Sequence, residues 1–169
     1  AVAPVLGGPA YLIRNVLYNT EHAWQLGRIG SGYVALHNSS VKNGGGVTIE
    51  PHLHAWLRNN IFIGNGSRAE AVRTRGKVMP YLDYDYNGYG LEGAPFRGTI
   101  AGKEFDSQET LRSNTMEKHG VRVDLRDFAV PVRIRENLFP EQLPPDLRLR
   151  AGSAAVDAGQ VIPNVNDDY

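Results

Sequence analysis

The chain has 169 residues, a length that suits one domain with its own hydrophobic core. Lysine plus arginine equals aspartate plus glutamate at 18 each, so no net field attracts nucleic acid or an anionic membrane surface. The absence of cysteine excludes disulfides, thiolate catalysis and thiolate metal sites, and no apolar run approaches the roughly 20 residues of a membrane-spanning helix.

Short apolar runs, separated by glycine, proline and asparagine, fill the first half of the chain. With 19 Gly and 10 Pro in all, this punctuation favours strands and turns over helices. Three runs share an order of aliphatic residue, basic residue, asparagine and second apolar stretch: residues 11–19, 34–41 and 55–63. Asn15 and Asn38 are 23 positions apart, and Asn59 follows after 21. This spacing predicts coils of about 20 to 29 residues, each with two or three short parallel strands.

Equivalent residues of successive coils would lie roughly 4.8 Å apart in a parallel stack, so that like side chains form ladders. We expect a buried aliphatic ladder, an asparagine ladder at a bend, and a basic row on an outer face. These three rows are, in that order, Ile13, Leu36 and Leu57; Asn15, Asn38 and Asn59; and Arg14, His37 and Arg58.

The second half of the chain lacks this repeat. We expect residues 1–90 to form the coils and residues 91–169 to form an irregular cap of the same domain. The glycine-rich run 88–102 predicts a loop, and the proline-rich run 139–145 predicts a segment that wraps over the surface. Asp157, which lies among small residues, predicts a turn fixed by hydrogen bonds from its side chain to the backbone.

One short helix is expected within the cap. Asp106 at the N-cap and Glu109 three positions later have capping-box spacing, which predicts a helix over about residues 107–117. Residues 121–125 alternate as a strand does, and residues 130–135 also alternate, with a proline that suits an edge strand.

Four stretches of the chain carry a resemblance to a known family. Residues 13–19 and 57–65 have the pattern of its coils, and residues 82–89 are similar to the segment that follows its last regular coils. Residues 147–159 contain a Gly-Ser-x-Ala-x-Asp-Ala-Gly element similar to its C-terminal one. In these stretches the chain resembles right-handed parallel β-helix proteins, the pectate-lyase-like proteins that process polysaccharides. The resemblance implies an all-β, right-handed parallel β-helix (solenoid) with an irregular C-terminal cap.

The resemblance also implies a secreted or periplasmic bacterial protein that is associated with polysaccharide. Members of this family have more coils than the sequence shows, so we expect upstream coils or a partner chain to stack on the N-terminal end. Two functions are compatible with the fold. The chain is either the C-terminal part of a protein that binds or degrades polysaccharide, as a lyase or glycosidase, or a non-catalytic module of an adhesin, sheath or fibre.

A basic cluster is the first candidate site. It contains His52, His54, Arg58, Arg73, Arg75 and Lys77. Removal of a proton beside a uronate carboxylate needs a base and a cation, so the candidate catalytic residues are Lys77, His52 and His54. Arg58, Arg73 and Arg75 are the candidate substrate-binding residues. The alternatives are a solvated coil face and a two-histidine metal site that lacks a third ligand at diagnostic spacing.

A pair of aspartates is the second candidate site. Asp83 and Asp85 alternate onto one face of a strand and, with Glu92, offer either a carboxylate pair or a site for Ca²⁺ as a cofactor, since calcium favours oxygen ligands. In the alternative interpretation both aspartates satisfy backbone groups in a turn.

Four tyrosines lie in the same stretch and offer ring faces for stacking on sugars: Tyr81, Tyr84, Tyr86 and Tyr89. Tyr84 and Tyr86 are the candidate substrate-binding residues among them. Packing in the core and cap is the alternative for all four.

Overall fold

The computed structural model describes residues 9–18, 24–26, 32–43, 46–49, 54–66, 69–74, 81–132 and 145–165. Within these residues the chain is mostly β, with mainly parallel sheets. Helix is confined there to α1 (Gln108–Asn114) and the 3-10 turn η1 (Leu125–Asp127). The expected β class with one short helix is confirmed.

Fourteen short strands make up the sheets within the described residues. They are β1 (Ala10–Ile13), β2 (Val16–Tyr18), β3 (Trp24–Leu26), β4 (Tyr33–Leu36), β5 (Ser39–Asn43), β6 (Val47–Ile49), β7 (Ala55–Arg58), β8 (Ile61–Asn65), β9 (Val72–Thr74), β10 (Leu82–Asp85), β11 (Gly88–Glu92), β12 (Gly98–Ile100), β13 (Lys103–Phe105) and β14 (Val121–Arg122).

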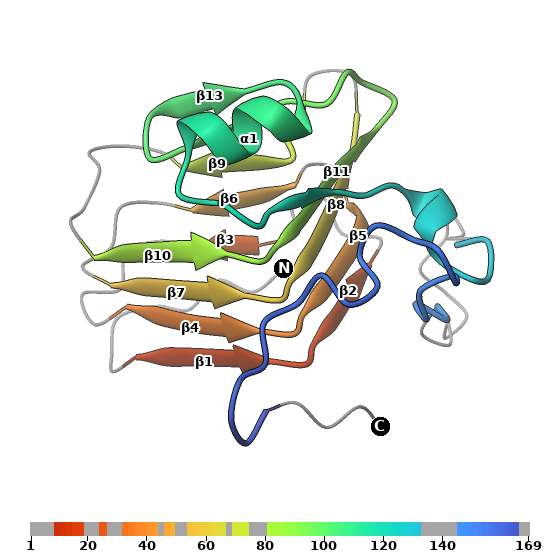
Figure 1. Ribbon diagram of the computed structural model, residues 1–169, viewed down its shortest axis with the longest axis horizontal. Helices are drawn as coiled ribbons and strands as arrows, with labels where there is room; N and C mark the ends of the chain where they lie inside the picture. The colour runs from red at the N-terminus through yellow and green to blue at the C-terminus, as the bar shows by residue number, and fades with distance from the viewer. Residues whose placement is uncertain are drawn as a thin grey trace.

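Every third strand of the chain joins the same sheet, except that β13 follows β12 into the third sheet. The first sheet has the order β1-β4-β7-β10, the second β2-β5-β8-β11-β14, and the third β3-β6-β9-β12-β13. All of these strand pairs are parallel except β12 with β13. One passage of the chain through the three sheets is called a coil below. Figure 1 shows the first-sheet strands of successive coils stacked in chain order.

The interior of the coils is filled by alternate residues of each strand. In the first sheet, the inward row is Leu12, Ala35, Leu57 and Tyr84. The last three of these residues are fully buried. The second sheet adds Phe62 and Tyr89, whose rings stack at 5.8 Å between centroids. Because strand side chains alternate in direction, the residues between these positions point away from this core.

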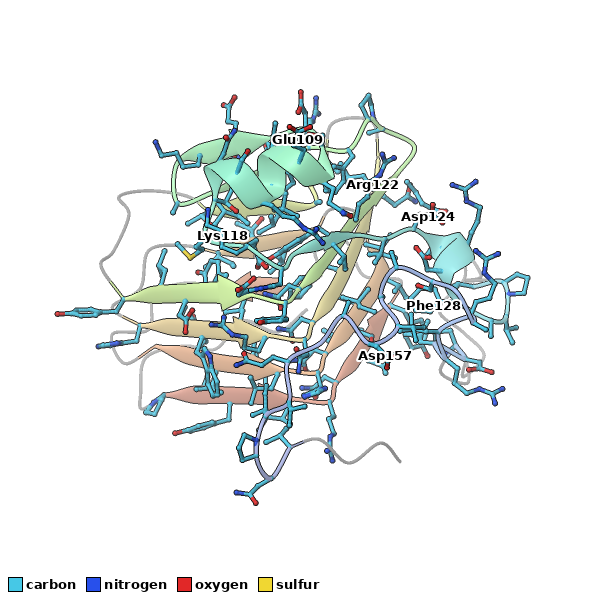
Figure 2. All side chains as sticks on the ribbon, viewed as in Figure 1. Glu109, Lys118, Arg122, Asp124, Phe128 and Asp157 are labelled. Atoms are coloured by element: carbon cyan, nitrogen blue, oxygen red, sulfur yellow. The ribbon has the colours of Figure 1, made fainter. Side chains whose placement is uncertain are left out.

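A second core lies on the outer face of the second sheet. Val41 and Ile63 of the sheet pack there against residues from the C-terminal part of the chain, among them Val123 and Phe128. Leu149 forms an antiparallel bridge with Phe128. The C-terminal segment therefore runs back over the second sheet, on the side where Figure 2 labels Phe128 and Asp157.

Each coil turns between the first and second sheets at a residue in the left-handed backbone region. These residues are Arg14, His37, Asn59 and Tyr86, with φ between 54° and 60°. In every coil the next residue is an asparagine, and these form the ladder Asn15, Asn38, Asn60 and Asn87. Left-handed φ is unusual for residues other than glycine, so the hydrogen bonds of the following asparagine hold the turn in place.

Asn60 shows how each rung of this asparagine ladder is bonded. Its Oδ1 accepts from the backbone N and the Nδ2 of Asn38, at 3.0 and 2.8 Å. Its own backbone N and Nδ2 donate to Oδ1 of Asn87, at 3.0 and 2.9 Å, and Nδ2 also donates to the carbonyl of Ala35. The amide is thus fully satisfied although the residue is completely buried.

Glu117 ends the asparagine ladder. Its carboxylate accepts from Nδ2 and the backbone N of Asn87, at 2.7 and 3.3 Å, and from the hydroxyl of Tyr89 at 2.6 Å. An ionised carboxylate can only accept hydrogen bonds, so it satisfies the donors of Asn87 and offers no donor of its own that would continue the ladder. Burial raises the pKa of Glu117 from its ordinary value of 4.5 to about 7, although the hydrogen bonds from Tyr89 and Asn87 act in the opposite direction.

All three expected ladders are wrong in the third coil. Asn60, not Asn59, is the rung, because Asn59 takes the left-handed position of the bend that Arg14 and His37 take in the first two coils. The same shift by one residue pairs Leu36 with Arg58, so Leu57 does not continue the aliphatic row and Arg58 does not continue the basic one. Ile13 is 40% exposed, and the buried row runs through Leu57 as described above.

The cap also differs from the expectation. Residues 88–102 are not a loop, since β11 and β12 continue the second and third sheets in parallel, and the coils extend to about residue 100. The helix is shorter than residues 107–117, and its capping box is formed by Ser107 and Thr110. Thr110 Oγ1 takes the place expected for the Glu109 carboxylate.

The two strands expected near the C-terminus have different outcomes. The strand expected over residues 121–125 is present only at residues 121–122, as β14, since residue 125 already belongs to η1; residues 130–132 belong to no strand. The remainder of the expected strand over residues 130–135 lies outside the described residues. Residues 139–144 of the proline-rich run lie outside them as well.

Replacing Asn60 tests the asparagine ladder. Asn60→Ala leaves the donors of Asn38 and the carbonyl of Ala35 buried without partners, and we expect the free energy of unfolding to fall by about 3 kcal/mol. Urea denaturation measures this change. The exposed Asn65 is the matched control, and Asn65→Ala should change stability by less than about 0.5 kcal/mol. Equal effects of the two substitutions would contradict a special role for the asparagine ladder.

The pH dependence of stability tests Glu117. Because the folded protein holds this proton more tightly than the unfolded chain, its contribution to stability is greatest below pH 4.5 and is lost as the pH rises to about 7. The expected loss is about 3 kcal/mol across this window.

The Glu117→Gln variant cannot ionise at this position, so urea unfolding from pH 4.5 to 8 should show a flatter profile than that of the wild type. The difference between the two profiles isolates Glu117 from other titrating groups. Identical slopes would show that Glu117 keeps an ordinary pKa.

Candidate functional site

The outer face of the first sheet carries a row of exposed aromatic residues. The register places Tyr11, Val34, Trp56 and Asp83 next to one another on β1, β4, β7 and β10. Tyr11 is 64% exposed and Trp56 is 37% exposed, and Tyr81 just before β10 is 58% exposed. Exposed aromatic rings that share one face of a sheet are candidates for a binding surface, whereas single exposed rings are common.

His54 completes this surface, which we call the aromatic face: Tyr11, His54, Trp56 and Tyr81. The His54 ring stacks on the Tyr81 ring with centroids 4.6 Å apart and an interplanar angle of 18°. A shallow hollow of about 330 Å³ lies beside these two rings. His54, Trp56 and Tyr81 line it, together with Val34 and Asp83. The aromatic face therefore combines ring surfaces with an imidazole and a carboxylate.

Arg58 lies beside the aromatic face and is 9% exposed. Its guanidinium donates to the carbonyls of Leu57 and Asp83, both at 3.1 Å, and forms an ion pair with the Asp83 carboxylate. Its Nε donates to Oε1 of Gln160 at 3.1 Å. Arg58 is thus an anchor between the sheet and the C-terminal segment, and its donors are used within the protein.

Gln160 is held by the bend as well as by Arg58. Its backbone N donates to Oδ1 of Asn59 at 2.8 Å, and its carbonyl accepts from Nδ2 of Asn59 at 2.7 Å. The side-chain amide of Asn59 therefore pairs with the main chain of Gln160 as a strand neighbour would. These bonds fix the C-terminal segment next to the outer face of the first sheet.

Asp85 forms a separate polar cluster with His119 and Tyr86. The Asp85 carboxylate bonds Nδ1 of His119 at 2.8 Å and accepts from the backbone N of His119 and of Tyr86. Partial burial by itself would raise the pKa of Asp85, but the hydrogen bonds from His119 and Tyr86 outweigh it and the pKa is lowered. The rings of Tyr86 and His119 stack at 4.2 Å between centroids.

The structure separates the residues of the predicted basic cluster. His54 and Arg58 lie at the first sheet, whereas Arg73 lies on β9 of the third sheet. The Nε of Arg73 is 3.7 Å from Oε1 of Glu70. His52, Arg75 and Lys77 lie outside the described residues. A common site for Arg58 and Arg73 is therefore wrong.

The second predicted site is also divided. Asp83 pairs with Arg58 and Asp85 with His119, so each aspartate has a partner of its own. In the described part of the chain, no three His, Asp or Glu side chains come together as ligands of a metal such as Ca²⁺. Tyr84 is fully buried in the inward row and offers no ring face to a sugar, so its assignment as a substrate-binding residue is wrong. Tyr86 lies at the bend and stacks on His119.

Sequence reasoning missed Tyr11 and Trp56 because the third coil was aligned one residue out of register. In the correct register Trp56 follows Tyr11 and Val34 in an outward row, a signal that the Asn60 rung would have given. Gln160 and His119 were missed because they reach their partners from more than 30 residues away, and no local pattern marks such contacts.

A larger hollow of about 620 Å³ lies between the β12–β13 hairpin and α1. Three carboxylates (Glu70, Glu104 and Asp106) and Arg97 are among its lining residues. It exposes no aromatic ring surface comparable to that of the first sheet, because Phe105, the aromatic residue of its lining, is buried. The aromatic face is therefore the better candidate for a binding site.

Comparison with known proteins gave no match among family models, curated proteins or solved structures. Within the described residues, neither helix has the length and apolar character needed to cross a membrane.

Replacing Arg58 tests the anchor. Arg58→Ala leaves the Gln160 side chain and the Asp83 carbonyl without their donor, and we expect a loss of about 2 kcal/mol in unfolding free energy. Hydrogen exchange of residues 158–162 should become faster than in the wild type. Asp83→Ala is the control, because the Asp83 carboxylate is mostly exposed and its ion pair contributes less than about 1 kcal/mol. Unchanged exchange at residues 158–162 would show that Arg58 does not hold the C-terminal segment.

Proposed function

We propose that the chain is part of a right-handed parallel β-helix, and that the outer face of its first sheet binds a polysaccharide. The three sheets with every third strand in common, and the asparagine ladder that joins the coils, support the β-helix. A secreted or periplasmic location is part of the proposal, since this is where such a ligand is met.

The exposed row of Tyr11 and Trp56 is the observation that carries the proposed binding. Sugar rings present apolar C–H faces that pack on aromatic rings, and the rigid sheet holds these rings in place without an ordering cost on binding. The two side chains lie two strands apart, about 10 Å by the strand spacing, so an extended chain that crosses the strands can contact both.

Polar groups beside the rings favour a ligand rich in hydroxyl groups. The exposed carboxylate of Asp83 and the imidazole of His54 can accept and donate hydrogen bonds at the shallow hollow. The guanidinium of Arg58 already bonds Asp83 and Gln160, so it does not offer a pair of parallel N–H donors to a uronate carboxylate. The proposed ligand is therefore an uncharged polysaccharide.

The proposal is limited to binding. Of the candidate bases, Lys77 and His52 lie outside the described residues, and His54 is stacked on Tyr81. The Asp83 carboxylate is engaged by Arg58. Binding depends only on the aromatic face itself.

Electrophoresis in native gels that contain a soluble polysaccharide tests this proposal. We expect a neutral glucan or xylan to retard the full chain, and Trp56→Ala to weaken the apparent affinity about three- to tenfold, because one stacked ring is lost. Tyr11→Ala should have a similar effect. Polygalacturonate should retard the chain less than the neutral polymers do.

Val130→Ala is the matched control, because Val130 is an exposed apolar residue away from the first sheet. It should leave the retardation unchanged. The proposal is wrong if none of the polymers retards the wild type, or if Trp56→Ala and Val130→Ala behave alike. Retardation by polygalacturonate alone would point to a uronate site elsewhere on the chain.

A further inference from the structure

A third hollow lies between the bends of the coils and the C-terminal segment, and we call it the bend hollow. Its volume is about 480 Å³, within the range of roughly 300 to 1,000 Å³ that is typical of small-ligand sites. The bends contribute His37, Asn59 and Tyr86 to its lining, and residues 155–161 of the C-terminal segment lie opposite them. Figure 2 labels Asp157 on this segment, where the segment runs past the bends.

Four lining residues of the bend hollow have a left-handed backbone: His37, Asn59, Tyr86 and Asp157, with φ between 54° and 60°. At the first three, the asparagine ladder holds the turn. Asp157 has no such ladder residue after it, since Ala158 follows. A left-handed residue without this support is a reason to ask what its side chain does.

The Asp157 side chain does not fix its own turn in the way that the sequence predicts. Ser153 does so instead, because its Oγ accepts from the backbone N of Ala155 at 3.1 Å and its carbonyl accepts from the backbone N of Val156 at 3.1 Å. The Asp157 carboxylate has no hydrogen-bond or ion-pair partner in the described part of the chain. It therefore remains available to a ligand in the bend hollow.

The charge of the bend hollow comes from Asp157. Among the described residues that line it, Asp157 is the only Asp, Glu, Lys or Arg. Arg58 reaches Gln160 of the same segment, but it already has Asp83 as its counter-ion. The bend hollow thus carries a negative charge that no lining lysine or arginine balances, and a cationic group complements it.

His37 does not offset this charge. The amide of Asn59 is oriented by Gln160, whose backbone N donates to Oδ1 of Asn59 while its carbonyl accepts from Nδ2. The second hydrogen of Nδ2 then faces Nε2 of His37, 3.1 Å away. In this arrangement Nε2 accepts with a lone pair, which only a neutral imidazole has.

Apolar side chains supply the rest of the surface of the bend hollow. Ile61 and Val121 line it from the second sheet, and Leu149 and Val156 line it from the C-terminal part of the chain. Val156 is 40% exposed, so part of this apolar surface is still in contact with water. A ligand with an apolar body would remove that surface from water, which is favourable.

We propose that the bend hollow binds a small organic amine, with its ammonium group at the Asp157 carboxylate and its apolar body against Ile61, Leu149 and Val156. None of the residues of the aromatic face lines the bend hollow. The inference therefore does not depend on polysaccharide binding.

An NMR titration of the full chain with 4-phenylbutylamine tests this inference. We expect saturable shifts of the methyl signals of Val121, Leu149 and Val156. The neutral probe 4-phenylbutanol should bind about fivefold more weakly, because it lacks the charge that pairs with Asp157. The anionic probe 4-phenylbutyrate should bind more weakly still.

Asp157→Asn removes the charge and keeps the shape of the side chain. Asparagine also adopts the left-handed region readily, so the turn should be preserved. We expect the affinity for the amine to fall about fivefold, to the level of the alcohol, while the affinity for the alcohol stays the same. Glu109→Gln is the matched control, because Glu109 is an exposed carboxylate on α1 and does not line the bend hollow. It should leave both affinities unchanged.

A second variant keeps the test valid if Asp157→Asn disturbs the turn. Val156→Lys places an ammonium group next to Asp157 at an exposed position, and it should abolish the preference for the amine over the alcohol. The inference fails if the wild type does not bind the amine, or if it binds the alcohol or 4-phenylbutyrate equally well. It also fails if the preference for the amine survives in both folded variants, or if the shifts lie away from the bend hollow.

Discussion

The buried asparagine ladder is the interaction on which the rest of the structure depends. Asn38 and Asn60 each tie their own bend to the coils before and after it, through their backbone N and side-chain amide. A slip of one residue would leave these amides unpaired in the core and would exchange the inward and outward faces of the strand. The ladder therefore sets the register of the first sheet, and with it the exposure of Tyr11 and Trp56 on one face.

Glu117 gives the asparagine ladder its direction and its end. An asparagine in its place would need a partner for its own donors, whereas the ionised carboxylate offers only acceptors, and it receives the Tyr89 hydroxyl as well. The same burial that satisfies Asn87 makes the charged carboxylate costly, which is why its pKa is raised. The Glu117 end of the ladder thus exchanges some stability at neutral pH for a defined stop.

The sequence predicted the repeat, two of the four rungs and the single helix, because spacing and punctuation are local signals. It placed the third rung at Asn59 since two asparagines are adjacent there and only the backbone φ separates the bend residue from the rung. The glycine-rich run around Gly90 predicts a loop, yet Gly90 lies in β11. A Cβ at this position would come within 2.2 Å of the Val123 carbonyl oxygen, so the glycine allows close packing of two chain segments. The pairs Arg58–Gln160 and Asp85–His119 join distant segments, so no pattern along the chain marks them.

The aromatic face spans several coils, because Tyr11, Val34 and Trp56 form one outward row across β1, β4 and β7. An extended ligand that crosses these strands would contact Tyr11 and Trp56 together. Because contacts along one ligand chain add with little further ordering cost, the two rings would bind such a ligand more strongly than either ring alone. The affinity of the aromatic face would then depend on the register that the asparagine ladder sets, since a slip by one residue would turn an outward ring toward the core.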